Sequence, residues 1–139
     1  MRYLVDSSLY VSSLDEMDSN YTQSSAVVSL VQQHIIITPT LVVAEVINVI
    51  ARIHPRITQT VYRNLLQNEI VNLDDFFLKS YVRRFPLPIA LKTSDLVIAV
   101  TAATTKSTLL TWDKQLLSSA GSICTVVSPS TLLKMSGFK

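Results

Sequence analysis

Tyr3-Leu4-Val5-Asp6-Ser7-Ser8 is a short apolar run that ends in a carboxylate and two hydroxyls. Its β-branched and aromatic residues predict a strand at residues 3–5 with Asp6 at its carboxyl end. Four similar apolar runs follow, and none shows the polar alternation of a half-exposed strand. Together they predict a sheet that helices cover on both faces. The expected further strands lie at residues 35–38, 70–73, 109–112 and 123–127.

Segments with helical periodicity separate these runs, so each strand is expected to reach the next through a helical crossover. The predicted class is therefore α/β, a three-layer α/β/α sandwich around a parallel sheet, formed as a single domain over residues 1–139. Pro39 precedes one helix, and Asp74-Asp75 cap another that Pro86 and Pro88 end. Ser94 is the expected N-cap of a third. The predicted helices cover one or two segments of 14–33 (broken near 20–25), then 40–52, 56–68, the segment after 75, 94–105 and 114–119.

Composition excludes several classes of protein. With 139 residues, of which 48% are hydrophobic and 16% charged, the chain is apolar enough to fold around a core. Only two glycines occur, Gly121 and Gly137, so a glycine-rich phosphate loop is excluded. The net charge of +2 gives little long-range attraction for nucleic acid. No apolar run is long enough to span a membrane, and we expect a cytoplasmic protein.

Cys124 is the single cysteine, which excludes an intramolecular disulfide and suits a reducing cytosol. It lies in the apolar run 123–127, so it is expected to act as a small buried hydrophobe rather than as a nucleophile.

Four carboxylates have informative positions. Asp6 and Asp113 each follow an apolar strand, and ligands of parallel sheets bind at such carboxyl ends. Asp95 lies in the first turn of a predicted helix, where free amides favour an anion. Glu45 interrupts the apolar helical run 41–47, where an unpaired charge is costly.

Each carboxylate also has a structural interpretation when it is taken alone. Asp6 can begin a turn, Asp95 can be a helix-start charge, and Asp113 can cap the next helix. Glu45 can pair with an arginine in the core. Considered jointly, the four favour an oxygen-rich site for Mg²⁺ or Mn²⁺ rather than zinc.

At these positions the sequence resembles the PIN domain family, and within it the VapC-type toxin ribonucleases. The resemblance covers nearly the whole chain through four stretches in a fixed order, at residues 3–8, 39–46, 91–99 and 110–114. It implies strand order 3-2-1-4-5. It also implies that Asp6, Asp95 and Asp113 hold the metal, and that Glu45 is a further ligand or orients the attacking water.

The resemblance further implies a single-strand-preferring endoribonuclease that uses Mg²⁺ or Mn²⁺, a cognate antitoxin bound in an apolar groove, and a homodimer. Ser8 matches a small hydroxyl residue of the family and can bond a carboxylate or a phosphate, or be a solvated turn serine. Lys92, Lys106 and Lys114 are candidate contacts to an RNA backbone. Trp112 either packs in the core or stacks on a base.

Three other functions are considered. The first is a catalytically silent PIN domain that binds RNA or protein. A receiver-like phosphoacceptor is disfavoured because Asp6 is followed by Ser7-Ser8 rather than by a second acid. A haloacid-dehalogenase-type phosphatase is disfavoured because Ser8 replaces the acid expected two residues after Asp6. His34 and His54 lie outside the four stretches and are expected to be structural or exposed.

Overall fold

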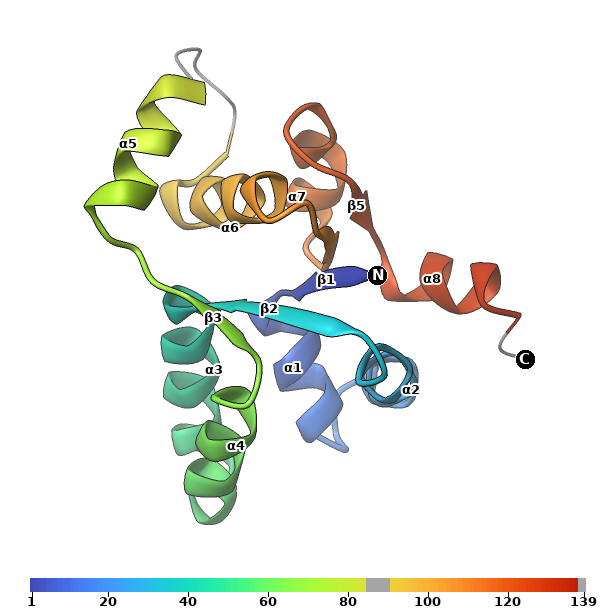
Figure 1. Cartoon of the computed structure of the whole chain (residues 1–139). Helices are drawn as coiled ribbons and strands as arrows, with labels where there is room; N and C mark the ends of the chain where they lie inside the picture. The colour runs from blue at the N-terminus through green and yellow to red at the C-terminus, as the bar shows by residue number, and fades with distance from the viewer. Residues whose placement is uncertain (85–90, 138–139) are drawn as a thin grey trace.

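A computed structural model describes residues 1–84 and 91–137. Its centre is a five-stranded parallel sheet with order β3-β2-β1-β4-β5 (Figure 1), which confirms the predicted class and strand order. The strands are β1 (Arg2–Val5), β2 (Ile35–Pro39), β3 (Glu69–Val71), β4 (Thr108–Leu110) and β5 (Val126–Val127).

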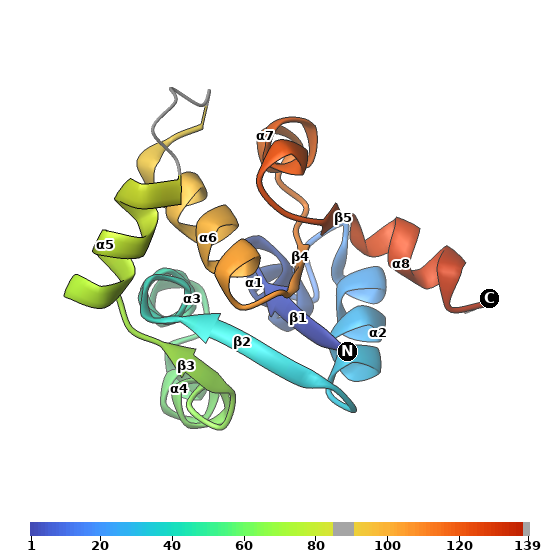
Figure 2. The ribbon, with the colours of Figure 1, turned by 45° about the horizontal axis from the view of Figure 1, so that its top comes forward.

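Helices cover both faces of the sheet, as the three-layer prediction requires (Figures 1 and 2). One face carries α1 (Ser7–Leu14), α2 (Tyr21–Val31), α3 (Thr40–Ile53) and α4 (Thr58–Leu65). The other face carries α5 (Asp75–Arg84), α6 (Thr93–Thr104) and α7 (Lys114–Ser119), and the last helix, α8 (Pro129–Met135), packs against α2. Short 3₁₀ turns lie at Pro55–Ile57 and Ala120–Ser122. No helix in the described ranges is long and apolar enough to cross a membrane.

The core lies between the sheet and the two helical layers. Leu4, Ile37 and Leu109 on adjacent strands are fully buried, as both-face coverage of a parallel sheet demands. On α3 the buried residues are Val42, Val46 and Ile50, which recur every four positions along one stripe. This stripe fixes the rotation of α3, and Glu45 therefore lies outside it.

The N-terminal helices differ from the prediction. Helix α1 begins at Ser7, directly after the first strand, whereas a start near residue 14 was expected. The expected break near 20–25 is also wrong, because the turns lie at residues 15–20 and α2 begins at Tyr21. The serines of this region are typical of turns, so the sequence pattern did not indicate the correct helix bounds. Ser12 and Ser24 are buried and satisfy each other through a 2.6 Å hydrogen bond, so they behave as core residues.

Other boundaries also need correction. Lys92, not Ser94, is the N-cap of α6. The predicted helix at 56–68 is a 3₁₀ turn followed by α4, and the fifth strand keeps only Val126–Val127 of the predicted 123–127. The third and fourth strands each begin one residue earlier than expected and end at Val71 and Leu110.

Two helix starts rest on recognisable caps. Helix α8 was not predicted, although Ser128 caps it by accepting from the Thr131 amide and Pro129 follows as the first helical residue. The expected cap of α5 is present, because the Phe77 amide donates to Asp74 Oδ1 at 2.9 Å. Pro86 and Pro88, expected to end that helix, lie outside the described residues.

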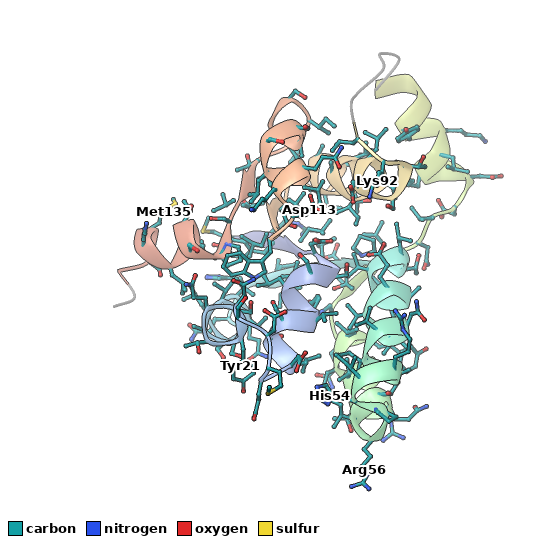
Figure 3. The ribbon with its side chains drawn as sticks, turned by 180° about the vertical axis from the view of Figure 1, so that it is seen from behind. Tyr21, His54, Arg56, Lys92, Asp113 and Met135 are labelled. Atoms are coloured by element: carbon teal, nitrogen blue, oxygen red, sulfur yellow. The ribbon has the colours of Figure 1, made fainter. Side chains whose placement is uncertain are left out.

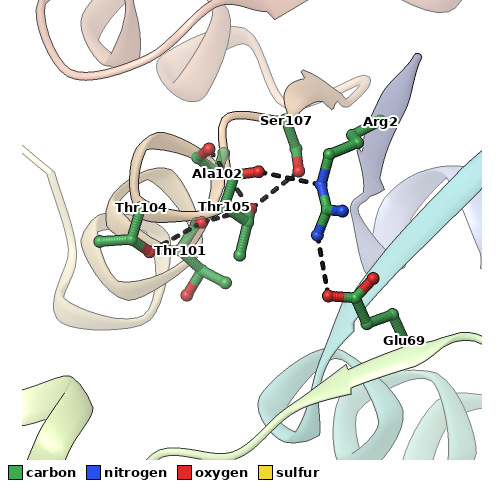
Figure 4. A network of polar contacts seen from close by, with 7 residues as sticks. All are labelled: Arg2, Glu69, Thr101, Ala102, Thr104, Thr105 and Ser107. Atoms are coloured by element: carbon green, nitrogen blue, oxygen red, sulfur yellow. Dashed lines mark hydrogen bonds and ion pairs between the residues drawn. The ribbon is translucent and has the colours of Figure 1, made fainter.

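Arg2 joins three elements at the amino edge of the sheet (Figure 4). Its Nε donates to the Thr105 carbonyl at 3.0 Å, just after α6, and its Nη2 lies 2.8 Å from Glu69 Oε1 on β3. A cation beside the last carbonyls of a helix offsets the negative end of the helix dipole. The side chain therefore stabilises the return from α6 into β4.

Lys106 has a left-handed backbone conformation (φ 53°) where α6 ends. The Ser107 amide donates to the Ala102 carbonyl and the Lys106 amide to the Ala103 carbonyl, the bonding pattern of a Schellman cap. This position favours glycine because a Cβ is strained there. We expect Lys106→Gly to raise the free energy of unfolding by about 0.5–1 kcal/mol in urea denaturation. Lys106→Ala keeps the Cβ and should give no such gain.

Cys124 is half-buried against the core, and burial raises the pKa of its thiol to about 11. We expect slow reaction with thiol reagents at pH 8, where the thiol stays protonated.

Between about pH 9 and 11 the unfolded thiol ionises first, so the Cys124 contribution to stability should fall as pH rises. Cys124→Ala should remove this component from the pH profile of stability. An identical profile in the variant would contradict the assignment.

Candidate active site

Two of the predicted carboxylates lie at the ends of adjacent strands. β1 pairs with β2 on one side and with β4 on the other, so the strand order reverses at β1. Asp6 follows β1 and is 5% exposed, and its amide donates to the Leu110 carbonyl at the end of β4. Asp113 lies three residues beyond β4. Both therefore lie at the reversal point, where parallel sheets bind ligands.

The other two come from helices that begin at the same edge of the sheet. Glu45 lies in α3, which starts directly after β2, and Asp95 lies in the first turn of α6. Both are half-buried. The helices thus bring their carboxylates toward those of the strand ends.

One open cavity of about 500 Å³ joins these positions. All four predicted carboxylates line it, as does a fifth acid, Asp18, from the turns between α1 and α2. The remaining lining residues are Ser7, Ser8, Val11, Ser12, Asn20, Val49 and Trp112.

Hydroxyl groups hold the carboxylates in place. Asp6 Oδ2 accepts from both Ser8 Oγ and Thr111 Oγ1 at 2.8 Å. The fully buried Thr111 hydroxyl also accepts from the Asp113 amide at 2.9 Å, so it links two members of the site. Ser7 Oγ donates to Glu45 Oε2 at 2.8 Å.

Ser7 and Thr111 are site residues that the sequence pattern did not indicate. Their positions carried a usable signal, since each is a hydroxyl residue one or two positions from a strand-end aspartate. Ser8 was a predicted site residue with an alternative as a solvated turn serine. Its hydroxyl donates to the Asp6 carboxylate, which agrees with the first of these interpretations.

Asp113 also caps α7. Its Oδ1 accepts from the Gln115 and Leu116 amides at 2.7 and 3.0 Å. The structural interpretation of this residue is therefore correct, and it does not compete with a role in the site, because the cap uses one oxygen only.

Mutual repulsion is visible in the pKa values of two carboxyls. Desolvation raises the pKa of Glu45, and the nearby Asp6 and Asp95 charges raise it further against the hydrogen bond from Ser7. The pKa of Asp95 is raised by desolvation and then by Asp113 and Asp6, while Lys92 lowers it. The groups are thus close enough to interact electrostatically. Among the described residues that line the cavity none is basic, and Lys92 acts on Asp95 from outside this lining.

The donor set fits a hard divalent cation, for which carboxylate oxygens are the preferred ligands. Among the described residues, the hydrogen bonds of Asp6, Glu45 and Asp113 engage one carboxylate oxygen each and leave the other for an ion. As the side chains are oriented here, however, no three His, Cys, Asp or Glu groups of residues 1–84 and 91–137 already form an ion site. The four acids line one cavity, and holding a single ion together would require their side chains to reorient.

The predicted basic contacts separate into two groups. Lys92 and Lys114 are exposed near the acidic residues, Lys92 as the N-cap of α6 and Lys114 directly after Asp113, and Figure 3 shows Lys92 and Asp113 from behind. Lys106 lies at the far end of the 12-residue α6, about 16 Å along the helix axis from Asp95. Its predicted place beside the cleft is therefore wrong.

Neither histidine lines the acidic cavity. His34 is exposed, with its ring centroid 5.5 Å from that of Tyr3, and His54 ends α3 with Nε2 3.5 Å from Asp15 Oδ1. Both match the expected structural or exposed positions.

The PIN domain family model matches residues 3–121, and the chain belongs to this family. No curated protein sequence matches this chain.

Several solved structures share the fold. FitAcB from Neisseria gonorrhoeae is 20% identical, with a TM-score of 0.63 and coverage of 94% of this chain and 99% of that one. DNA-bound VapBC from Salmonella typhimurium is 11% identical, with a TM-score of 0.66 and coverage of 93% and 98%. VapC20 of Mycobacterium tuberculosis, a sarcin-ricin loop cleaving toxin, is 9% identical, with a TM-score of 0.63 and coverage of 84% and 93%.

Proposed function

We propose that the protein is a Mg²⁺- or Mn²⁺-dependent endoribonuclease that prefers single-stranded RNA, and the toxin of a type II toxin–antitoxin pair. The observation that carries this proposal is the convergence of Asp6, Glu45, Asp95 and Asp113 on one cavity at the carboxyl edge of the sheet. The FitAcB and VapBC structures and a sarcin-ricin loop cleaving toxin share this fold and support the choice of substrate and biological role.

Each residue has a defined task in this proposal. Asp6, Asp95 and Asp113 would hold the cation, and Glu45 would complete the site or orient the attacking water. When bound, the cation would lower the pKa of water in the site and would neutralise charge on the phosphoryl oxygens. Thr111, Ser7 and Ser8 hold the carboxylates, while Lys92 and Lys114 attract the phosphate backbone toward a cavity that would otherwise repel it.

Cleavage of an RNA panel by the purified protein tests the proposal. We expect cleavage with Mg²⁺ or Mn²⁺, none in excess chelator, and none by Asp6→Asn under either condition. Full activity in excess chelator would rule out the metal-dependent mechanism.

A catalytically silent PIN domain is the second candidate, and one observation favours it. No three of the described acids are already oriented around a single ion position. RNA binding without cleavage under every metal condition would support this alternative.

We further propose that the antitoxin occupies a groove on the other side of α1. Tyr10, Ser13 and Leu14 of that helix line an apolar cavity with residues of α2 and α4. A neighbouring polar cavity shares Gln32, Ile36, Asn64 and Asn68 with it, so the two form one groove with an apolar floor and a rim of amides. An extended segment with one apolar anchor fits such a groove. Co-purification with the product of an adjacent small gene for a DNA-binding protein tests this proposal.

A further inference from the structure

Part of the acidic cavity is not acidic. Among its described lining residues are one aromatic ring, Trp112, and one side-chain amide, Asn20. An indole does not ligate a hard cation, and the amide of Asn20 can offer one only an uncharged carbonyl oxygen, so both side chains differ in chemistry from the carboxylates.

Trp112 is fixed from inside the protein. Its indole N–H donates to Ser24 Oγ at 2.8 Å, and Ser24 shares a 2.6 Å hydrogen bond with Ser12. Both serines are at most 2% exposed. Because the indole N–H is a donor only and is satisfied internally, the part of the ring that lines the cavity presents an apolar surface.

The backbone of Trp112 ties the ring to the carboxylates. Its amide donates to Ser8 Oγ at 3.3 Å, and the same hydroxyl donates to Asp6 Oδ2. Asp113 is the next residue in the chain. Residue 112 is therefore held directly beside two members of the acidic site, with its ring packed in part against the core.

The side chain of Asn20 does not make the capping hydrogen bond that is usual at its position. The residue is the N-cap of α2, where an asparagine usually accepts from a backbone amide of the first turn. Its backbone amide donates to Asp18 Oδ1 at 2.8 Å, which fixes the turn without using the side chain. A side-chain amide offers both a donor and an acceptor, the pair that an adenine edge can bond.

We propose that Trp112 and Asn20 form a nucleobase subsite, in which Trp112 stacks on the base next to the reacting phosphate and Asn20 bonds the edge of that base. Single-stranded RNA is commonly recognised by such stacking on aromatic side chains combined with hydrogen bonds to base edges. The subsite rests on the proposed ribonuclease function and adds a determinant of cleavage specificity to it.

Fluorescence gives a direct test because Trp112 is the only tryptophan of the chain. Binding would be measured with Mg²⁺ in a Glu45→Gln background, which is expected to be inactive while keeping Asp6, Asp95 and Asp113. A short oligoribonucleotide should quench the fluorescence. An abasic oligomer with the same number of phosphates should bind more weakly and leave the fluorescence unchanged. Equal quenching by both oligomers would overturn the stacking.

Two substitutions separate stacking from folding. Both variants lack tryptophan, so their binding is measured by the anisotropy of a dye-labelled oligomer. Trp112→Leu should weaken binding of the base-bearing oligomer by about tenfold or more, the effect of losing one stacked base, and should not change binding of the abasic oligomer. Trp112→Phe keeps a ring and should retain most of the difference between the two oligomers. If Trp112→Leu retains the wild-type ratio of the two affinities, the ring only packs and the proposal is wrong.

Asn20→Ala tests the edge contact. The variant should keep fluorescence quenching and the melting temperature, because the side chain caps nothing, but its KM should rise severalfold for adenine and less for other bases at the cleavage position. Unchanged base preference would remove Asn20 from the subsite. If Trp112→Leu and Asn20→Ala both cleave RNA with the wild-type rate and base preference, this inference alone is wrong. If the wild-type protein neither binds nor cleaves RNA, the proposed function is wrong as well.

Discussion

Asp6→Asn, Asp95→Asn and Asp113→Asn should each lower metal-dependent RNA cleavage by about a hundredfold or more. Loss of even an outer partner of a metal ligand costs about 10–100-fold, and these substitutions would remove the charge of a proposed ligand itself. The three side chains line one cavity at the strand-order reversal, so none can replace another. Initial rates at saturating Mg²⁺ and at saturating Mn²⁺ give the measurement.

Asp75→Asn is the matched control. Asp75 lies in the first turn of α5 as Asp95 lies in the first turn of α6, but it is exposed and does not line the acidic cavity. The control should cleave RNA at the wild-type rate. Circular dichroism should show that all four variants are folded. Two aspartate variants with near-wild-type turnover would show that the site is assigned incorrectly.

The placement of the carboxylates was predictable because it follows from topology. Asp6 ends an apolar run, and a run that is buried on both faces has only its ends available for a charge. Glu45 was predictable for the opposite reason, since it is a charge inside an apolar helical run. The three-dimensional convergence of these residues needed the strand order, which the resemblance supplied and the structure confirms.

The hydroxyl network was less accessible from sequence. Ser7, Ser12 and Ser24 occur in polar stretches that are typical of turns as well as of helices, and only tertiary contacts distinguish the two. The same ambiguity displaced the start of α1. Thr111 lies in the apolar run 109–112, where its hydroxyl shows no partner until the fold places it against Asp6. Lys106 was misplaced although the predicted helix 94–105 already separates it from Asp95, because the full length of that helix carries it to the opposite edge of the sheet.

Asp95→Asn should stabilise the metal-free protein even though it should abolish the proposed nuclease activity. Burial and the charges of Asp113 and Asp6 raise the pKa of the Asp95 carboxyl, so its ionised form is disfavoured in the folded state. The amide removes one charge and nearly keeps the shape. Relief on the order of 0.5–2 kcal/mol is usual when an unfavourable surface charge is removed, and it should exceed the helix-start interaction that Asp95 loses, about 0.3–1 kcal/mol.

The pH dependence has a defined sign. Because the pKa values of Asp95 and Glu45 are raised in the folded state, the folded protein holds these protons more tightly than the unfolded chain does. Below the ordinary carboxyl pKa both states are protonated and no penalty exists. As pH rises through the raised pKa values the penalty appears, so stability in chelator should fall toward neutral pH through these two groups. The stability of Asp95→Asn should fall less over the same pH range.

Mg²⁺ should reverse the order of stability of the wild type and Asp95→Asn. An ion that binds only the folded state stabilises it by mass action, about 2.7 kcal/mol at a hundred times the Kd. The wild type should therefore gain melting temperature with Mg²⁺, and Asp95→Asn, which lacks one ligand, should gain much less. Asp75→Asn should gain as much as the wild type and should be slightly less stable in chelator, because it loses a helix-start charge and relieves no repulsion. If Asp95→Asn instead matches Asp75→Asn in both conditions, Asp95 is only a helix-start residue and the acids do not act as one site.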